Sequence, residues 1–240
     1  MLLDYGLIVD VETTGLDPEK DKIIEIGLLE FAVYSDEEAK ITSMYSQLED
    51  PGTSLSPEII KITGITETLL QGKTIDWSLV GSYFSQASIV IAHNMEFDRA
   101  FLMKKDEIKK TQCHWACSIR HIDWKKYGFK SQSLNYLACD QGFVNPFPHR
   151  ALFDCATTFQ VIKKYIHELV HNSYQKQYEI QAVGAPFELK EKLKQNGYFW
   201  NPRKRLWCKI LFADQLQGER DFLKEEIYRG NLRHEESLID

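Results

Sequence analysis

The chain has 240 residues, of which 43% are hydrophobic and 27% are charged, and its net charge is −6. These values are typical of globular proteins and argue against a disordered or collagen-like chain. The first eleven residues lack a basic start followed by a small-residue cleavage site, and the apolar runs are too short to cross a bilayer. Because the five cysteines follow no regular framework, we expect reduced thiols, a cytoplasmic location and no membrane partner.

The beginning of the chain is predicted to form an antiparallel meander. Three segments have the apolar content of strands: Tyr5–Val11, Lys22–Val33 and Ile41–Leu48. Turn signals separate them at residues 16–18 and 34–36.

Helices and strands alternate after this meander. Helices are predicted at Ser56–Ile62, Asp76–Gln86, Asn94–Lys105, Ser131–Cys139 and Arg150–His171. Strands are predicted at Ala87–Ala92 and His114–Ser118. A meander followed by alternating elements predicts an α/β fold, a mixed five-stranded sheet flanked by helices.

The polar segment Asn172–Gln177 is the expected boundary between a domain at residues 1–172 and a small α+β domain at residues 178–232. The predicted elements of the second domain are a strand, a helix, a turn, a strand and a closing helix, at Tyr178–Val183, Pro186–Asn196, Trp200–Arg203, Leu206–Phe212 and Gln215–Tyr228. The charge distribution differs along the chain. Residues 1–175 carry 17 Lys and Arg against 24 Asp and Glu, whereas residues 176–212 carry 8 against 3.

Asp10 and Glu12 are the first candidates for chemistry. Residues two apart on a strand point to the same face, so both carboxylates leave the sheet together. Two carboxylates this close are unfavourable unless a cation lies between them, and hard oxygen ligands select magnesium or manganese. Ordinary solvated acids at a strand end are an equally good interpretation of this pair alone.

Two further clusters place acids at expected helix starts. His93, Asn94 and Asp98 follow a buried strand, at the edge of the sheet where sites in α/β folds collect. His149 and Asp154 are five residues apart, which puts the histidine on the loop entering a helix and the aspartate inside it. Each cluster could also be a favourable acid near a helix N-terminus.

Together these residues resemble the DEDDh exonucleases, the DnaQ-like branch of the ribonuclease H-like fold. Asp-Val-Glu-Thr-Thr-Gly-Leu at 10–16 matches the first motif of that family, His-Asn-Met-Glu-Phe-Asp at 93–98 the second, and His149 with Asp154 the third. The segments at 56–66 and 133–137 are similar to the helices that precede the second and third motifs. The resemblance covers about residues 4–170, and it is specific because three motifs occur in order.

The resemblance implies a 3′→5′ exonuclease that releases nucleoside 5′-monophosphates from single-stranded 3′ ends of DNA or RNA. Two Mg²⁺ or Mn²⁺ ions would be held by Asp10, Glu12, Asp98 and Asp154, and His149 would be the general base. The terminal nucleotide would be lined by Thr13, Thr14, Gly15, Leu16, His93 and Asn94. Leu16 would lie beneath the last base.

Two zinc patterns are weaker. His167, Glu168 and His171 match His-Glu-x-x-His, but they end the predicted helix that begins at the third motif. Cys113, His114, Cys117 and His121 match no closed four-ligand spacing well, so buried thiols are favoured.

The C-terminal domain interleaves aromatic and cationic residues, a pattern that suits single-stranded nucleic acid. The candidate contacts are Trp200, Arg203, Lys204, Arg205 and Trp207. The tryptophans could instead form only the core of the domain, or the domain could dock on a protein partner. The alternative function is a catalytically idle module of the same fold that binds nucleic acid or docks on a polymerase, as a proofreading subunit does.

Overall fold

The computed structural model describes residues 2–34 and 39–239. The chain divides into two compact units, unit 1 at Met1–Ser173 and unit 2 at Tyr174–Asp240. The part of the chain that the structure describes contains no helix both long and apolar enough to cross a membrane.

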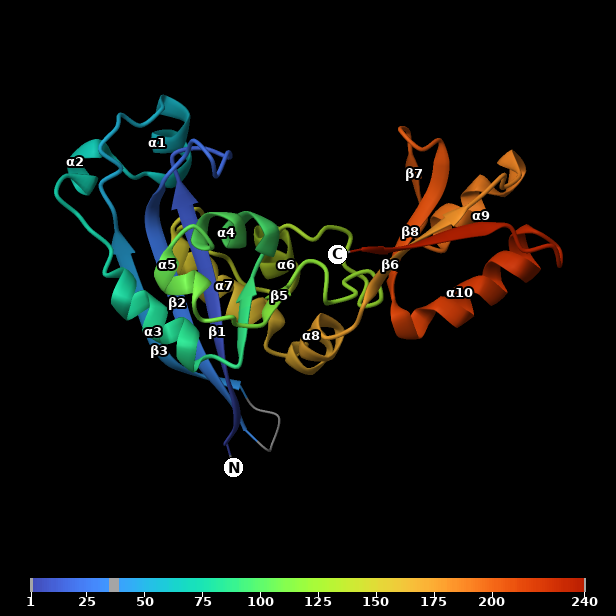
Figure 1. The fold of residues 1–240 in the computed structure, drawn as a ribbon, viewed down its shortest axis with the longest axis horizontal. Helices are drawn as coiled ribbons and strands as arrows, with labels where there is room; N and C mark the ends of the chain where they lie inside the picture. Colours follow the sequence, from blue (N-terminus) through green and yellow to red (C-terminus); the bar gives the residue numbers. More distant parts are fainter. Residues whose placement is uncertain (1, 35–38, 240) are drawn as a thin grey trace. The chain divides into compact units, whose positions relative to one another are not determined.

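Unit 1 contains a mixed five-stranded sheet in the order β3-β2-β1-β4-β5 (Figure 1). Its strands are β1 (Leu2–Thr13), β2 (Ile23–Tyr34), β3 (Ala39–Leu48), β4 (Ile89–Ala92) and β5 (Trp115–Cys117). The first three strands form the predicted antiparallel meander, whereas β4 and β5 run parallel to β1. The predicted turn at residues 34–36 lies mainly outside the described residues.

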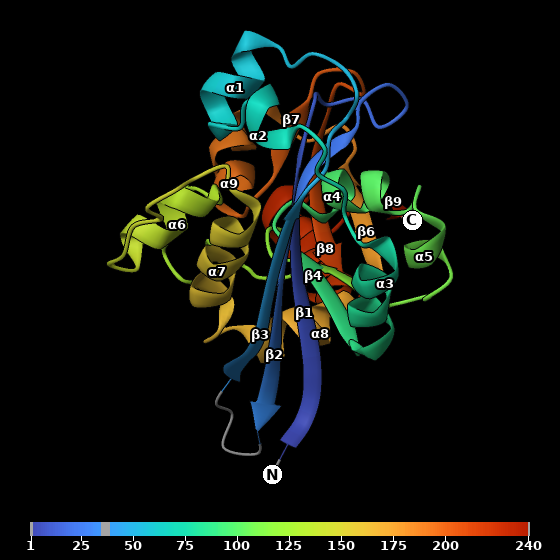
Figure 2. The same cartoon turned by 90° about the vertical axis from the view of Figure 1, so that its left-hand side faces the viewer.

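Helices cover both faces of this sheet, as the predicted fold class requires. They are α1 (Pro57–Thr63), α2 (Glu67–Leu70), α3 (Trp77–Gln86), α4 (Met95–Leu102), α5 (Asp106–Lys109), α6 (Leu134–Asp140), α7 (Ala151–Ile162) and α8 (Ile166–Ser173). In Figure 2, α6 and α7 lie on one side of the strands and α3 and α5 on the other. Alternate residues of β1 supply the two cores: Leu7 and Val9 pack towards α3 and α4, and Ile8 packs towards α7.

The helix predicted at Arg150–His171 is interrupted. Residues 163–165 form a turn between α7 and α8. At this turn the ring of Tyr165 packs against Trp124 and Tyr127, with centroid distances of 5.2 and 4.5 Å. Helical periodicity does not reveal this break, because the aromatic contacts come from a distant part of the chain.

Unit 2 is a four-stranded antiparallel sheet in the order β7-β8-β6-β9, with helices packed on one face. Its strands are β6 (Gln177–Ala182), β7 (Phe199–Asn201), β8 (Leu206–Phe212) and β9 (His234–Ile239). Its helical segments are η1 (Phe187–Leu189), α9 (Lys190–Gln195), η2 (Ala213–Gln215), α10 (Leu216–Phe222) and a π-helical turn, η3 (Leu223–Ile227). Trp200 lies within β7, and the turn expected at that residue follows it, at residues 202–205.

Strand β9 was not predicted from the sequence. It has a weak apolar pattern and is held by pairing with β6 along its whole length. An ion pair between Arg220 on α10 and Glu236 on β9, with two N–O distances of 2.7 Å, attaches the strand to the helix. Both interactions join distant parts of the chain, so local sequence does not encode them.

Candidate active site

Three of the predicted metal ligands meet at the carboxyl end of β1. Asp10, Glu12 and Asp154 each offer a carboxylate oxygen, and these oxygens all lie within 4.8 Å of one another. Asp10 and Glu12 follow Ile8 on the face of β1 that α7 covers, and Asp154 lies in the first turn of α7. Among the described residues, this is the only group of three or more His, Cys, Asp or Glu side chains arranged to hold one ion.

Asp98 reaches the same region from α4. Its side chain is 2% exposed, and its Oδ1 accepts a hydrogen bond from the backbone N–H of Val11 at 3.0 Å. Since Val11 lies between Asp10 and Glu12, this bond places the fourth carboxylate against the same strand end. The structure therefore brings together all four acids that were predicted from three separate motifs.

The four carboxyl groups resist ionisation. Burial, followed by repulsion from the neighbouring carboxylates, raises the pKa of Asp10 well above its usual value and that of Glu12 to about 8. Burial also raises the pKa of Asp98 to about 8 and that of Asp154 to about 6. Such a cluster favours a ligand that brings positive charge.

His149 lies beside this cluster on the loop that enters α7. Its side chain is exposed, and its backbone has a φ of 61°, in the left-handed region that non-glycine residues seldom adopt. The His149 imidazole is close enough to Asp154 to act against the increase in the pKa of that carboxyl group. The histidine is thus positioned at the solvent-facing side of the acids.

Glu25 is a fifth carboxylate at the site, and no motif in the sequence predicted it. It lies on β2 directly opposite Glu12 and is 2% exposed. Among the described residues it is the one acid of the five that forms an ion pair: Arg150 donates from Nε and Nη2 to its two oxygens, each at 3.0 Å. Glu25 also accepts the Ala151 N–H at 3.1 Å, so it holds the first turn of α7 against the sheet.

Gly27, two residues further along β2, permits this close approach of α7. A Cβ atom at Gly27 would lie 2.4 Å from the carbonyl carbon of Ala151, which is backbone and cannot move aside. The Sγ of Cys155 donates to the Gly27 carbonyl at 3.3 Å. The pattern Ile-Glu-Ile-Gly at 24–27 was visible in the sequence, but nothing local indicated that it faces α7.

Asn145 is a second residue of the site that no motif in the sequence predicted. It is buried, and its Nδ2 donates to Asp154 Oδ1 at 2.9 Å, while the Arg150 N–H donates to Asp154 Oδ2 at 3.1 Å. These two bonds fix the orientation of the Asp154 carboxylate. An asparagine in a Pro-rich loop carries no sequence signal for such a role.

The residues predicted to line a nucleotide do not all present free side chains. Leu16 is 83% exposed, and Asn94 is exposed with a φ of 73° and no capping hydrogen bond from its side chain. Thr14, in contrast, donates to Asp21 Oδ1 and accepts the Lys22 N–H, each at 3.0 Å. The side chain of Thr14 therefore organises its own loop.

Gly15, Thr13 and His93 are also engaged within the protein. A Cβ on Gly15 would lie 2.4 Å from Asp21 Oδ2, so the glycine permits close approach of Asp21. The Thr13 side chain is buried. His93 Nδ1 is 2.7 Å from Ser118 Oγ, which links the ends of β4 and β5; its Nε2 is buried and has no hydrogen-bond partner among the described residues.

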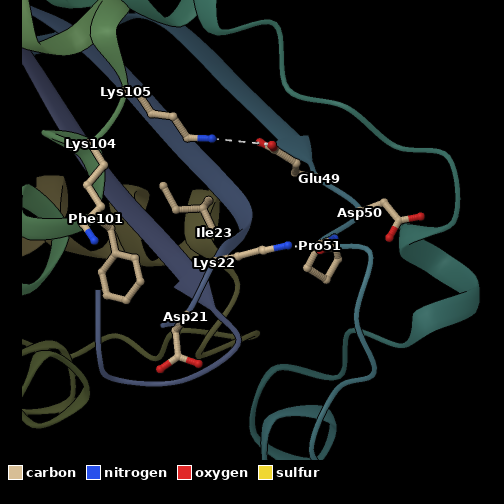
Figure 3. Close-up of a pocket in the computed structure, with 9 residues that line it drawn as sticks. All are labelled: Asp21, Lys22, Ile23, Glu49, Asp50, Pro51, Phe101, Lys104 and Lys105. Carbon is tan, nitrogen blue, oxygen red and sulfur yellow. Dashed lines mark hydrogen bonds and ion pairs between the residues drawn. The ribbon is translucent and has the colours of Figure 1, made fainter. Parts of the chain in front are cut away.

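A neighbouring pocket of about 390 Å³ lies beside the loop that contains Asp21 (Figure 3). Its three lysines already have partners: Lys22 donates to the Pro51 carbonyl at 2.7 Å, Lys105 pairs with Glu49 at 3.5 Å, and Lys104 pairs with Glu19 at 2.8 Å. Because Lys104 and Lys105 are paired with carboxylates and Lys22 is hydrogen-bonded to a carbonyl, this pocket is a weaker candidate for an anionic ligand than its lysines suggest.

The two zinc patterns have structural roles. Glu168 accepts the Asp123 N–H at 3.0 Å and the Tyr127 hydroxyl, so it organises a loop. His121 Nδ1 accepts the Cys117 N–H at 3.0 Å, and His114 Nε2 is 2.9 Å from Ser173 Oγ.

The predicted contacts in unit 2 differ in exposure. Trp207 packs against the core of the unit, and Trp200, at 49% exposure, meets it edge-on with ring centroids 5.6 Å apart. Lys204 forms an ion pair with Glu179, whereas Arg203 and Arg205 are exposed.

The chain is similar to known proteins over more than half of its length. The family model described as "Exonuclease", that of the RNase T type, matches residues 7–162. The chain is 30% identical to "DNA polymerase III subunit epsilon" of Aquifex aeolicus, over 68% of this chain and 81% of that protein. It is also 30% identical to "DNA polymerase III PolC-type" of Thermotoga petrophila, over 74% of this chain but only 13% of the relative's length.

A solved structure of a zinc-bound complex of E. coli ExoI with single-stranded DNA has a similar fold. It aligns with a TM-score of 0.60 at 15% identity, covering 98% of this chain and 62% of that one. The predicted ribonuclease H-like architecture is thereby confirmed. The chain belongs to the RNase T-type, DnaQ-like exonuclease family.

Proposed function

We propose that this protein is a metal-dependent 3′→5′ exonuclease that releases nucleoside 5′-monophosphates from DNA, RNA or both. The observation that carries the proposal is the convergence of Asp10, Glu12 and Asp154 within 4.8 Å, with Asp98 held against the same strand. A catalytically idle protein would have no use for such a costly group of acids.

The donor set fits two divalent cations. Every ligand is a carboxylate oxygen, the type preferred by Mg²⁺ and Mn²⁺. Asp10, Glu12, Asp98 and Asp154 would hold the two ions. Such ions supply an activated water and stabilise the oxygen that leaves.

Side chains of the protein would then position the attacking water and accept its proton. His149 is exposed next to Asp154 and would accept the proton of the attacking water, a task for which an imidazole is suited at neutral pH. The water oxygen forms a bond to phosphorus, and the bond from phosphorus to the 3′ oxygen of the preceding nucleotide breaks. Glu25 and Arg150 keep α7 in place, so Asp154 and His149 keep their relative position.

The exposed residues at the site would hold the end of the strand. Leu16 would contact the last base with its exposed apolar side chain, and the exposed Asn94 amide would hydrogen-bond the nucleic-acid strand. Thr13, Thr14, Gly15 and His93 would act mainly by shaping the loop and the strand ends that surround the nucleotide.

A direct test uses 5′-labelled single-stranded oligonucleotides with Mn²⁺. We expect a ladder that shortens from the 3′ end, with nucleoside 5′-monophosphates as products, and loss of this ladder in Asp10→Ala and His149→Ala. Matched single- and double-stranded DNA and RNA would then define the substrate. Activity that survives Asp10→Ala would contradict the metal site.

The match to a polymerase III epsilon subunit favours a second candidate, a proofreading subunit that acts when docked on a polymerase. The two candidates differ in the behaviour of the isolated chain. A proofreading subunit would show much higher activity on mismatched 3′ ends when its polymerase is added, whereas an autonomous exonuclease would not respond.

A further inference from the structure

Most lysines of unit 2 form ion pairs with glutamates, whereas most of its arginines form none within the described residues. Its ion pairs are Lys192–Glu226, Lys194–Glu191, Lys204–Glu179, Lys209–Glu219 and Arg220–Glu236, and His234 also contacts Glu236. It has five arginines, and among the described residues only Arg220 has a carboxylate partner. Within residues 39–239, no ion pair involves the other four, which are Arg203, Arg205, Arg229 and Arg233.

These four arginines lie at one end of the sheet of unit 2. Ala182, the last residue of β6, is opposite Trp207 on β8 and His234 on β9. The β7–β8 turn at residues 202–205 and the residue before β9, Arg233, are therefore at the same end of the sheet. We call this region the arginine end, defined by Arg203, Arg205, Arg229 and Arg233.

A pocket of about 550 Å³ opens at the arginine end. Arg229 and Arg233 line it together with apolar groups of Leu189, Ile227 and Tyr228, and the lining also includes one carboxylate, that of Glu188. The Tyr228 hydroxyl donates to the Val183 carbonyl at 2.8 Å, which fixes the ring. This volume is in the range of small-molecule sites, and guanidinium groups beside apolar walls suit a ligand with a phosphate and a planar base.

Backbone conformation independently singles out two of these arginines. Arg205 and Arg229 have φ angles of 57° and 50°, in the left-handed region that glycine adopts more readily. The other described non-glycine residues with positive φ are Asn94, Gln112 and His149, and two of these three belong to the proposed active site. A large side chain retained where glycine would be less strained points to a role for that side chain.

We propose that the arginine end binds the phosphates of single-stranded nucleic acid, with one nucleotide in the pocket beside Arg229 and Arg233. Arginine presents paired N–H donors that match phosphate oxygens, which lysine does not. Phe187, 74% exposed, and Trp200 offer aromatic surfaces in the same unit for base stacking. The inference rests on the proposed function in one respect: the bound strand is the one that the active site shortens.

The test measures binding of a fluorescent oligothymidylate of about 20 nucleotides to the full chain by anisotropy, in EDTA so that no hydrolysis occurs. The double variant Arg229→Gln, Arg233→Gln is compared with Lys192→Gln, Lys194→Gln, which removes the same charge from lysines that already have partners. We expect about tenfold weaker binding for the arginine variant alone. Its slope of log Kd against log salt should fall by about 1.4, at about 0.7 per lost phosphate contact. Equal affinity of the two double variants would overturn the proposal.

Arg229→Gly separates binding from folding, because glycine relieves the backbone at that position. We expect weaker binding with a Tm at or above that of the wild type; wild-type affinity in this variant would also overturn the proposal. Hydrolysis of a dinucleotide with Mn²⁺, a substrate that offers few phosphates to bind, should be unchanged in the arginine variants, and its loss would count against a separate binding surface. If the wild type hydrolyses no substrate, the exonuclease proposal fails while the anisotropy result stands by itself.

Discussion

The two units differ in the sign of the charged side chains that, among the described residues, lack an ion-pair partner. At the carboxyl end of β1 in unit 1, four carboxylates gather with no cationic side chain in an ion pair with them in the described residues, and only Glu25, their neighbour, is paired with Arg150. In unit 2 the carboxylates neutralise lysines and Arg220, and four arginines remain. Buried charge without a partner costs folding free energy, so the carboxylates of unit 1 favour a cation. The four arginines of unit 2 are exposed, so their donors are accessible to the phosphates that we propose as their ligand.

Asp10→Asn tests the role of the carboxylate cluster in unit 1, and its expected effect is the largest. Loss of one carboxylate should reduce exonuclease activity about 10³-fold or more, because the ions that the cluster holds stabilise the transition-state charge. At pH 8.5, where the cluster is more fully ionised, the same change should stabilise the metal-free protein by about 1–2 kcal/mol, since it removes one charge from a repulsive group.

The matched control is Asp140→Asn, at an exposed acid on α6. Activity and urea denaturation in EDTA would be measured for both variants. A destabilised Asp10→Asn protein with normal activity would show that the cluster is structural.

His149→Gln should lower kcat by about 10²-fold and leave Mn²⁺ affinity nearly unchanged, because a general base contributes to the chemical step and is not a metal ligand. His167→Gln, at an exposed histidine on α8, is the control and should behave as the wild type. A His149 variant that binds Mn²⁺ poorly would instead make the histidine a ligand.

The four acids of this site were predictable from sequence, whereas the residues that hold them in position, such as Glu25, were not. Asp10 with Glu12, Asp98 and Asp154 occur in short motifs whose spacing on strands and helices is local information. Glu25 lies 125 residues from Arg150 in the sequence, and its role depends on the packing of α7 on β2.

The same distinction holds for the fold. The meander and the alternating elements follow apolar patterns, so their positions were predicted within a few residues. The turn between α7 and α8 depends on aromatic contacts of Tyr165, and β9 depends on pairing with β6 and on Glu236. Long-range contacts of this kind leave no local pattern.

Gly27→Ala tests whether close packing of α7 maintains the site. The added methyl group would meet the Ala151 backbone, so we expect a loss of about 1–3 kcal/mol of stability and about a tenfold loss of activity as α7 moves. Gly218→Ala, where nothing lies within 4 Å, should be neutral or stabilising. Urea denaturation and initial rates would be measured together, and full activity in Gly27→Ala would show that α7 tolerates displacement.

The smallest expected effect is on stability as a function of pH without metal. The pKa of Glu12 and of Asp98 is raised to about 8 in the folded protein, so the folded state binds more protons than the unfolded chain, and stability falls as pH rises towards 8. His93 and His121 act in the opposite direction, because burial lowers the pKa of each to about 4, but their contribution is complete above about pH 6.5.

The comparison is therefore made between pH 7 and pH 8.5 in EDTA. We expect Tm to fall by a few degrees over this interval, about the shift that 1 kcal/mol produces, and Mn²⁺ to restore it more at pH 8.5 than at pH 7. A Tm that rises with pH in EDTA would mean that the carboxyl groups are not crowded as the structure shows.

The most direct test of the central claim is calorimetric titration of the protein with Mn²⁺ at pH 7 in two buffers of different ionisation enthalpy. If the four carboxylates share divalent cations, binding should saturate at two ions and release protons, because carboxyl groups with a pKa of about 8 must ionise to become ligands. Asp10→Asn should abolish most of the signal. Absence of saturable binding, or binding with no proton release, would contradict the account.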